Sequence, residues 1–167
     1  MDIKWVNLTR VLNEFADRFI ELARGNLDQN NSNATRTLYD SFEKIVEVGE
    51  DHYSVKISME DYGKYVENGR GPGGFPPIDK IQEWVEVKPI SIQPDMNGKI
   101  PSVRQVSFAI AKKIAEEGTQ GKPFFEPAKE VAIREFEAAI DEAIEDDIYD
   151  YINELVIKGM NKTFGGK

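Results

Sequence analysis

The chain has 167 residues, 40% hydrophobic and 31% charged, which is enough apolar material for one globular domain with a modest core. It contains no cysteine and one histidine, His52, so disulfides, thiolate metal sites, a cysteine nucleophile and a histidine-cluster metal site are excluded. The net charge of −9 argues against sequence-independent binding to DNA or RNA, because an acidic surface repels phosphate.

The N-terminal quarter is predicted to be helical. Apolar residues recur at spacings near 3.6 from Trp5 to Arg24, which indicates an amphipathic helix, and Gly25-Asn26 is its expected end. The stretch from Gln29 to Ala34 is rich in Asn and Ser and is predicted to be a loop. A short helix is predicted within Thr35 to Phe42.

The next segment changes period and predicts a β-hairpin. Lys44 to Val48 is rich in β-branched residues, Gly49 to Asp51 is typical of a turn, and apolar and polar residues alternate from Tyr53 to Met59. His52 lies beside this turn, and we expect it to face solvent.

Three loops rich in glycine or proline separate the remaining elements. They are expected over 68–77, 88–101 and 118–123. Tyr62 to Glu67 precedes the first loop as a short helical turn. Ile78 to Val87 forms a helix between the first two loops, with Trp84 on its core face rather than at an interface.

Two further helices complete the chain. Ser102 suits the N-cap of a helix that ends near Gly118. A long helix is predicted from about Glu126 to Lys158, closed by Gly159, and the tail 160–167 is expected to be frayed. The predicted fold is α+β and a single domain over 1–167: a small antiparallel sheet or β-hairpin packed by an N-terminal helix, a central helix pair and a long C-terminal helix.

The start of the chain lacks the basic-then-apolar order of a signal peptide, and no run approaches the ~18 apolar residues of a membrane span. We therefore expect a protein made and folded in the cytoplasm that has no contact with a membrane.

Two stretches have compositions that could indicate a ligand-binding site, one for phosphate and one for a metal ion. Gly69 to Gly74 is rich in glycine but lacks the GK[ST] ending of a phosphate-binding loop, so a hinged arm or docking loop is the favoured interpretation. The last helix carries a dense acidic cluster, which we expect to be a solvated helix face rather than an Mg²⁺ or Ca²⁺ site. The cluster consists of Asp141, Glu142, Glu145, Asp146, Asp147 and Asp150.

Two adjacent phenylalanines, Phe124 and Phe125, stand where the last helix opens. Either both belong to the core, one facing each way, or at least one docks on a partner, since exposed aromatic residues are favoured interface anchors. A Ser–His–Asp set cannot be assembled from one histidine on a turn, so no catalytic residue is predicted.

Two segments carry a resemblance to a known family. Tyr62 to Arg70 reads YGKYVENGR, and about fifty residues later Lys122 to Ala128 reads KPFFEPA at the start of the last helix. In this order the two segments resemble the minor tail-component, or tail-completion (neck), proteins of lambda-like siphophages. The order of helix, Thr37 to Phe42 stretch and hairpin is also similar to that family, and the specific part of the resemblance is about sixteen residues.

The chain departs from the family pattern in two places. The usual member has Gly-Thr where this chain has Gly69-Arg70, and its central region is shorter than Gly71 to Gly118. The segment PPIDKIQEWVEVKPI resembles a variant from phages and prophages in which a helix with a tryptophan follows the Gly/Pro loop. These differences bear on the position within the particle, head side or tail side.

The resemblance implies assembly rather than catalysis. Such proteins form a ring, usually six-fold, that joins the tail tube to the head connector of the virion, and DNA only passes through the lumen. The implied partners are other copies of the chain, the tail tube protein and the head connector proteins, with no enzyme activity, metal or cofactor. A ring needs heterologous contacts, so each subunit supplies an arm and a groove that receives it.

The candidate subunit-interface residues come from the two segments and the loop between them. Tyr65, Val66 and Glu67 are expected to fix the base of the arm, Gly69 to need a backbone shape that glycine adopts easily, and Arg70 to be either an ion-pair partner or solvated. The full candidate set is Tyr65, Val66, Glu67, Gly69, Arg70, Phe75, Pro76, Pro123, Phe124, Phe125 and Pro127.

Two other functions stay open on sequence alone. The chain could be a small acidic adaptor or regulatory binding module that docks through its acidic helix on a basic partner. It could also be a metal-dependent enzyme that uses the carboxylates of Asp141 to Asp150.

Overall fold

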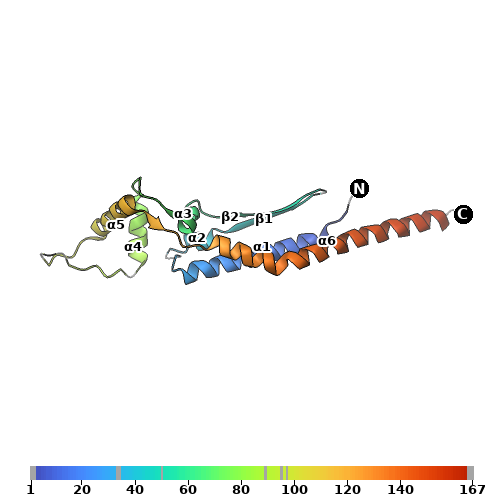
Figure 1. The fold of residues 1–167 in the computed structure, drawn as a ribbon, viewed down its shortest axis with the longest axis horizontal. Helices are drawn as coiled ribbons and strands as arrows, with labels where there is room; N and C mark the ends of the chain where they lie inside the picture. The colour runs from blue at the N-terminus through green and yellow to red at the C-terminus, as the bar shows by residue number, and fades with distance from the viewer. Residues whose placement is uncertain are drawn as a thin grey trace. The chain divides into compact units, whose positions relative to one another are not determined.

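The structure, a computed structural model, describes residues 3–32, 35–49, 51–88, 90–94, 96 and 98–164, and its fold is α+β as predicted (Figure 1). The elements in chain order are α1 (Val6–Gln29), α2 (Thr37–Asp40), β1 (Glu43–Val48), β2 (Tyr53–Ser58), α3 (Gly63–Asn68), β3 (Gly69–Arg70), α4 (Ile78–Val87), α5 (Val103–Glu117), β4 (Thr119–Gln120) and α6 (Phe125–Phe164).

The contacts within the chain define two compact units. The first unit comprises 1–23, 43–58 and 127–167, and the second comprises 24–42 and 59–126. The segments of the two units alternate along the sequence, so their division follows no linker between domains. The single domain over 1–167 stays a prediction.

The first unit is built on α1 and α6, which run antiparallel. Leu8 lies beside Asp147, and the rings of Phe15 and Phe136 meet edge to face with centroids 5.9 Å apart. The apolar stripe of α1 is buried as its period predicts. The buried apolar residues of this unit are Leu8, Val11, Leu12, Ala16, Phe19, Ile20, Ala23, Ala128, Ala132 and Ala143.

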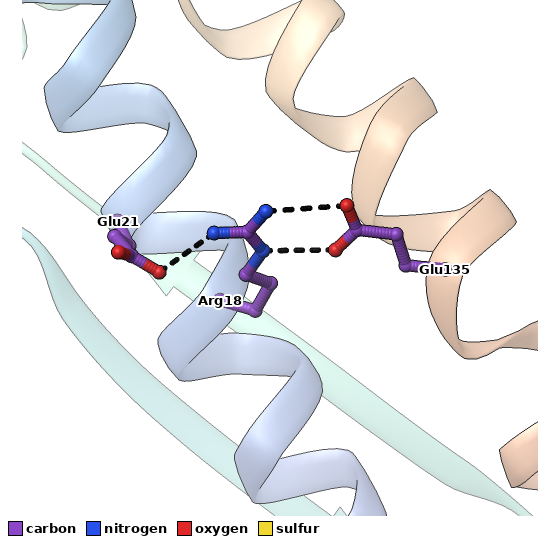
Figure 2. Close-up of polar contacts among 3 residues, drawn as sticks. All are labelled: Arg18, Glu21 and Glu135. Atoms are coloured by element: carbon purple, nitrogen blue, oxygen red, sulfur yellow. Dashed lines mark hydrogen bonds and ion pairs between the residues drawn. The ribbon is translucent and has the colours of Figure 1, made fainter.

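An ion pair fixes the register of α1 and α6 at the surface. Arg18 donates from Nε and Nη2 to the two carboxylate oxygens of Glu135, at 2.8 and 3.2 Å, and from Nη1 to Glu21 at 2.9 Å (Figure 2). The hydrogen bond from Arg18 holds the pKa of Glu135 below its ordinary value of 4.5. The two-pronged geometry matters more for register than for stability, because the pair is open to solvent and screened.

The predicted hairpin is present in the first unit. β1 and β2 pair antiparallel in a register that runs from Glu43 opposite Ser58 to Val48 opposite Tyr53. Val46, Val55 and Ile57 are half-buried, as the alternation predicts, whereas Tyr53, on the same predicted face, is 49% exposed. Lys44 joins the hairpin to α1 through an ion pair to Asp17 at 2.6 Å. The side chain of His52 is 67% exposed, as expected for the turn.

One residue of the acidic cluster is not solvated. Asp147 is only 3% exposed, and its carboxylate accepts hydrogen bonds from the backbone N–H groups of Asn7 and Leu8, at 3.0 and 2.9 Å, and from the Asn7 side-chain amide at 3.0 Å. These N–H groups belong to the first turn of α1 and have no partner within that helix. The interpretation of the cluster as a solvated face is therefore wrong for Asp147, which caps α1, whereas the other five acidic residues are exposed.

The second unit contains α2 to α5, β3, β4, the last turns of α1 and the start of α6. Helices α4 and α5 pack against each other, with Val85 and Ala111 buried between elements of this unit. Ser102 caps α5 as predicted: its hydroxyl accepts from the N–H of Gln105, and the Gln105 side chain accepts from the Ser102 N–H at 2.9 Å. Trp84 is half-buried, and the Lys88 ammonium lies 5.4 Å from the centroid of its ring.

The structure corrects four boundaries. Helix α1 does not stop at Gly25 but continues to Gln29, because the burial of Leu27 stabilises one more helical turn. The loops 68–77 and 118–123 contain β3 and β4, which pair with each other. Helix α6 passes Gly159 and includes 160–164 of the tail that was predicted to be frayed, while 165–167 and residues 33, 34, 50, 89, 95 and 97 lie outside the described residues.

Among the described residues, no helix is both long and apolar enough to cross a membrane.

Replacement of Asp147 by alanine should destabilise the protein by about 2 kcal/mol or more, because it leaves buried N–H groups of α1 without an acceptor. Chemical denaturation monitored by circular dichroism measures the loss. Asp146→Ala is the matched control on the same helix, because Asp146 is exposed, and it should change the free energy of unfolding by less than about 0.5 kcal/mol. Equal effects of the two substitutions would contradict the capping role.

Candidate functional site

The two segments that carry the family resemblance meet in the second unit. Glu67 is the centre of this contact, because it sits near the end of α3 and reaches the start of α6, 57 residues further along the chain. Its Oε2 accepts the N–H groups of Phe124 and Phe125, both at 2.7 Å, and its Oε1 accepts that of Glu126 at 3.1 Å. Glu67 thus caps α6 and places a negative charge where the helix dipole is positive.

Backbone pairing extends the contact on either side of Glu67. The carbonyl oxygen of Val66 accepts the N–H of Lys122 at 2.7 Å. The two-residue strands β3 and β4 pair antiparallel, with Gly69 opposite Gln120 and Arg70 opposite Thr119. We call this set of contacts, from Val66 to Arg70 and from Gly118 to Glu126, the motif joint.

Glycines permit the close approach of the two backbones in the motif joint. Gly69 has a φ of +76° and Gly118 a φ of +78°, a region that side chains with a Cβ rarely adopt. A Cβ at Gly69 would collide with the carbonyl oxygen of Thr119, and one at Gly118 with that of Arg70. The expected backbone requirement at Gly69 is therefore observed, and Gly118 shares it.

Phe124 belongs to the core. Its side chain has no exposed surface, and its ring meets Phe42 and Phe125 edge to face at centroid distances of 6.2 and 6.4 Å. Phe125 is half-buried. Phe124 consequently offers no surface to a partner in this conformation, and of the adjacent pair only Phe125 keeps accessible area.

Two asparagines that the sequence analysis assigned to a helix end and a loop hold the segment before α6. The Asn26 amide donates to the carbonyl oxygen of Phe124, and the Asn30 amide donates to that of Pro123, each at 2.9 Å. The two residues are four apart, so they lie on one side of the end of α1. The four-residue spacing of the two asparagines is visible in the sequence, but only the structure shows that both contact the segment before α6.

The remaining candidates lie at the surface, Tyr65 and Pro123 in the second unit and Pro127 in the first. Tyr65 is 50% exposed beside the Lys64 ammonium, while Pro123 and Pro127 are exposed and Pro127 occupies the first turn of α6 as predicted. Tyr62, which precedes them, has its phenol pKa raised above 10.0 by partial burial.

The loop after β3 presents an aromatic pair to solvent. Phe75 is 46% exposed and its ring lies 5.4 Å from that of Phe108 on α5, which is 52% exposed. The Arg70 guanidinium donates to the carbonyl oxygen of Gly74, and the N–H of Gly73 donates to the carbonyl oxygen of Ala115 at 2.8 Å. The loop is thus tied back to its own unit. Pro76, in the same loop, is buried, and Phe108 was not among the residues predicted from the sequence.

These contacts position backbone and aromatic groups. Within the part of the chain that the structure describes, no group of three or more His, Cys, Asp or Glu side chains is arranged to hold a metal ion.

Comparison with protein-family models, with curated proteins and with solved structures finds no match for this chain.

Replacement of Glu67 by alanine should lower the free energy of unfolding by about 1 to 3 kcal/mol, because the N–H groups of Phe124 and of the first two residues of α6 lose their acceptor. Glu67→Gln should fall between alanine and wild type, since one of its two terminal atoms becomes a donor. Urea denaturation measures both. Glu60→Gln is the control, because Glu60 is exposed nearby. A wild-type midpoint for Glu67→Ala would refute the cap.

A glycine pair gives a second test of the motif joint. Gly118→Ala should cost about 2 kcal/mol or more, because φ is positive and the new Cβ meets the Arg70 carbonyl oxygen. Gly71→Ala, where nothing lies within 4 Å of the added Cβ, should stay within about 0.5 kcal/mol of wild type. Thermal melting of both variants checks the difference, and similar melting temperatures would show that the backbones are not held together here.

Proposed function

We propose that this chain is a non-enzymatic structural protein of a tailed phage or prophage that forms a ring at the head–tail junction, as tail-completion or neck proteins do. The observation that carries the proposal is the motif joint. The two segments that resemble the family are distant in sequence, yet Glu67 of one segment caps the helix that the other segment opens.

The roles of the motif residues suit assembly better than catalysis. Glu67 has its carboxylate engaged by three backbone N–H groups, and Val66 and Gly69 contribute backbone contacts. A carboxylate used in this way fixes a helix and is not free to accept a proton from a substrate. Residues that fix the base of a loop are what a subunit needs if that loop contacts a neighbour.

The loop that follows the motif joint is the proposed arm. Phe75 and Phe108 offer paired aromatic surface, and Tyr65 lies exposed on α3. Aromatic residues contribute large contact area at low cost in side-chain entropy, which makes them frequent interface anchors. The proposed partners of these surfaces are other copies of the chain, the tail tube protein and the head connector proteins, within a virion assembled in the host cytoplasm.

A second function is kept because one observation favours it. Asp141, Glu142, Glu145, Asp146 and Asp150 are exposed along one helix. A small acidic adaptor would use such a helix to dock on a basic partner. This alternative expects a stable one-to-one complex and no ring.

Deletion of the gene from its phage or prophage tests the proposal by electron microscopy of the lysate. We expect filled heads lying apart from finished or overlong tails, with joined particles restored when the wild-type gene is supplied in trans. Mass spectrometry of purified wild-type particles should detect the chain. Intact, infectious particles from the deletion would eliminate the neck function and leave the adaptor, which a pull-down for a basic partner would then examine.

A further inference from the structure

The C-terminal end of α6 exposes a large apolar surface. Helix α1 begins beside Asp147, and every side chain from 154 to 162 is exposed, so this end of α6 continues past its antiparallel neighbour. We call residues 152–162 the overhang. Its large apolar side chains are between 46 and 57% exposed: Ile152, Leu155, Val156, Ile157 and Met160. A run of solvent-exposed apolar side chains on one helix indicates an interaction surface.

A groove in the same unit has the complementary character. It has a volume of about 410 Å³ and lies among α1, β2 and α6. Its apolar lining includes Leu12, Phe15, Tyr53 and Ile133, of which Tyr53 and Ile133 are each 49% exposed. A groove of this size admits several side chains of a helix rather than the whole helix.

The charges of the two surfaces match. Glu137 and Asp141 line the groove four residues apart on α6, where like charges at this spacing repel. Lys158 and Lys162 are also four residues apart and follow Leu155 at i+3 and i+7, which places them beside the apolar side chains of the overhang. Both pairs have the same rise of about 6 Å along a helix. Each carboxylate can therefore face one ammonium when the two helices lie side by side. Lys158 exchanges its ion pair with Glu154 of its own helix, 3.5 Å long, for this contact, and a solvent-exposed pair of that kind contributes little stability.

The overhang cannot reach the groove of its own chain. Val156 lies fifteen residues beyond Asp141 on one continuous helix, which corresponds to about 22 Å at 1.5 Å per residue. A contact between the two surfaces must therefore join different copies.

We infer that the overhang of one copy docks in the groove of the next copy, with Lys158 and Lys162 against Glu137 and Asp141. The contact is heterologous, because two different surfaces meet, and repetition of such a contact closes a ring or extends a filament. The inference deepens the proposed function by naming a subunit contact in addition to the arm, and it rests on that function for the closure of the ring.

Cysteine cross-linking tests the contact directly, because the chain has no cysteine of its own. Tyr53→Cys marks the groove and Val156→Cys marks the overhang. When an affinity-tagged Tyr53→Cys chain is mixed with an untagged Val156→Cys chain under mild oxidation, the mixed dimer should form several-fold more than either dimer of one variant. Ile45→Cys replaces Tyr53→Cys in the control, because Ile45 is 55% exposed on the same hairpin but does not line the groove. Equal cross-linking with Ile45→Cys would overturn the inference.

Charge reversal provides an independent test by sedimentation at high protein concentration. The variant Glu137→Lys/Asp141→Lys has a basic groove and a basic overhang, and Lys158→Glu/Lys162→Glu has both surfaces acidic. Each variant alone should be monomeric where the wild type self-associates, and an equimolar mixture should recover the association. A wild-type chain that stays monomeric, or a mixture that does not recover, would overturn the inference.

The outcomes separate this contact from the proposed function. Separate heads and tails in the deletion lysate, combined with no cross-link between Tyr53→Cys and Val156→Cys, would keep the neck function and reject this contact. A specific cross-link combined with intact particles from the deletion would keep the contact between copies and reject the neck function.

Discussion

Each of the two longest helices begins at a carboxylate supplied from a distant part of the chain. Asp147 accepts the first free N–H groups of α1, and Glu67 accepts those of α6. A helix leaves its first N–H groups without intrahelical partners, and a residue next to the helix usually satisfies some of them. Here the acceptors come from 139 and 57 residues away, so capping a helix also fixes a tertiary contact. Within the first unit the Asp147 cap sets where α1 starts along α6, and the ion pair of Arg18 with Glu135 agrees with that register. Within the second unit the Glu67 cap brings α3 to the entrance of α6, and the pairing of β3 with β4 follows from it.

Local patterns predicted the elements whose cause is local. The alternation around Tyr53 gave the hairpin, and Ser102 gave the start of α5, because these signals act within a few residues. The end of α1 could not be predicted in this way. Gly25 is a sound stop signal by propensity, but Leu27 is buried and Asn26 binds a carbonyl oxygen next to α6, so tertiary contacts outweigh a propensity cost of about 1 kcal/mol. The ladder of β3 with β4 has only two residues in each strand, which is too short to leave a periodic signal.

In the candidate site, too, local features could be predicted from the sequence and tertiary contacts could not. The sequence identified the two segments and the need for glycine at 69, but it did not show that the segments touch. Glu67 was expected to fix the base of an arm, and the structure gives that expectation a chemical form, the capping of α6. Phe124 and Phe125 could not be separated by pattern, because adjacent residues on a helix differ in direction by about 100° and either could face inward. Asp147 was hidden among acidic neighbours, since only burial distinguishes a capping carboxylate from a solvated one.

The overall charge places a condition on any assembly of this chain. With a net charge of −9, free copies repel one another at long range, and salt screens this repulsion beyond about 10 Å. A contact between copies must therefore gain its free energy from buried apolar surface and from local pairs of opposite charge. The overhang carries two lysines beside exposed apolar side chains, and the groove carries two carboxylates beside Tyr53 and Ile133. A contact between these two surfaces therefore supplies both buried apolar surface and local pairs of opposite charge. Long-range repulsion with short-range attraction keeps isolated copies apart at low concentration. It permits association at high protein concentration, where copies meet closely enough for the short-range attraction to act.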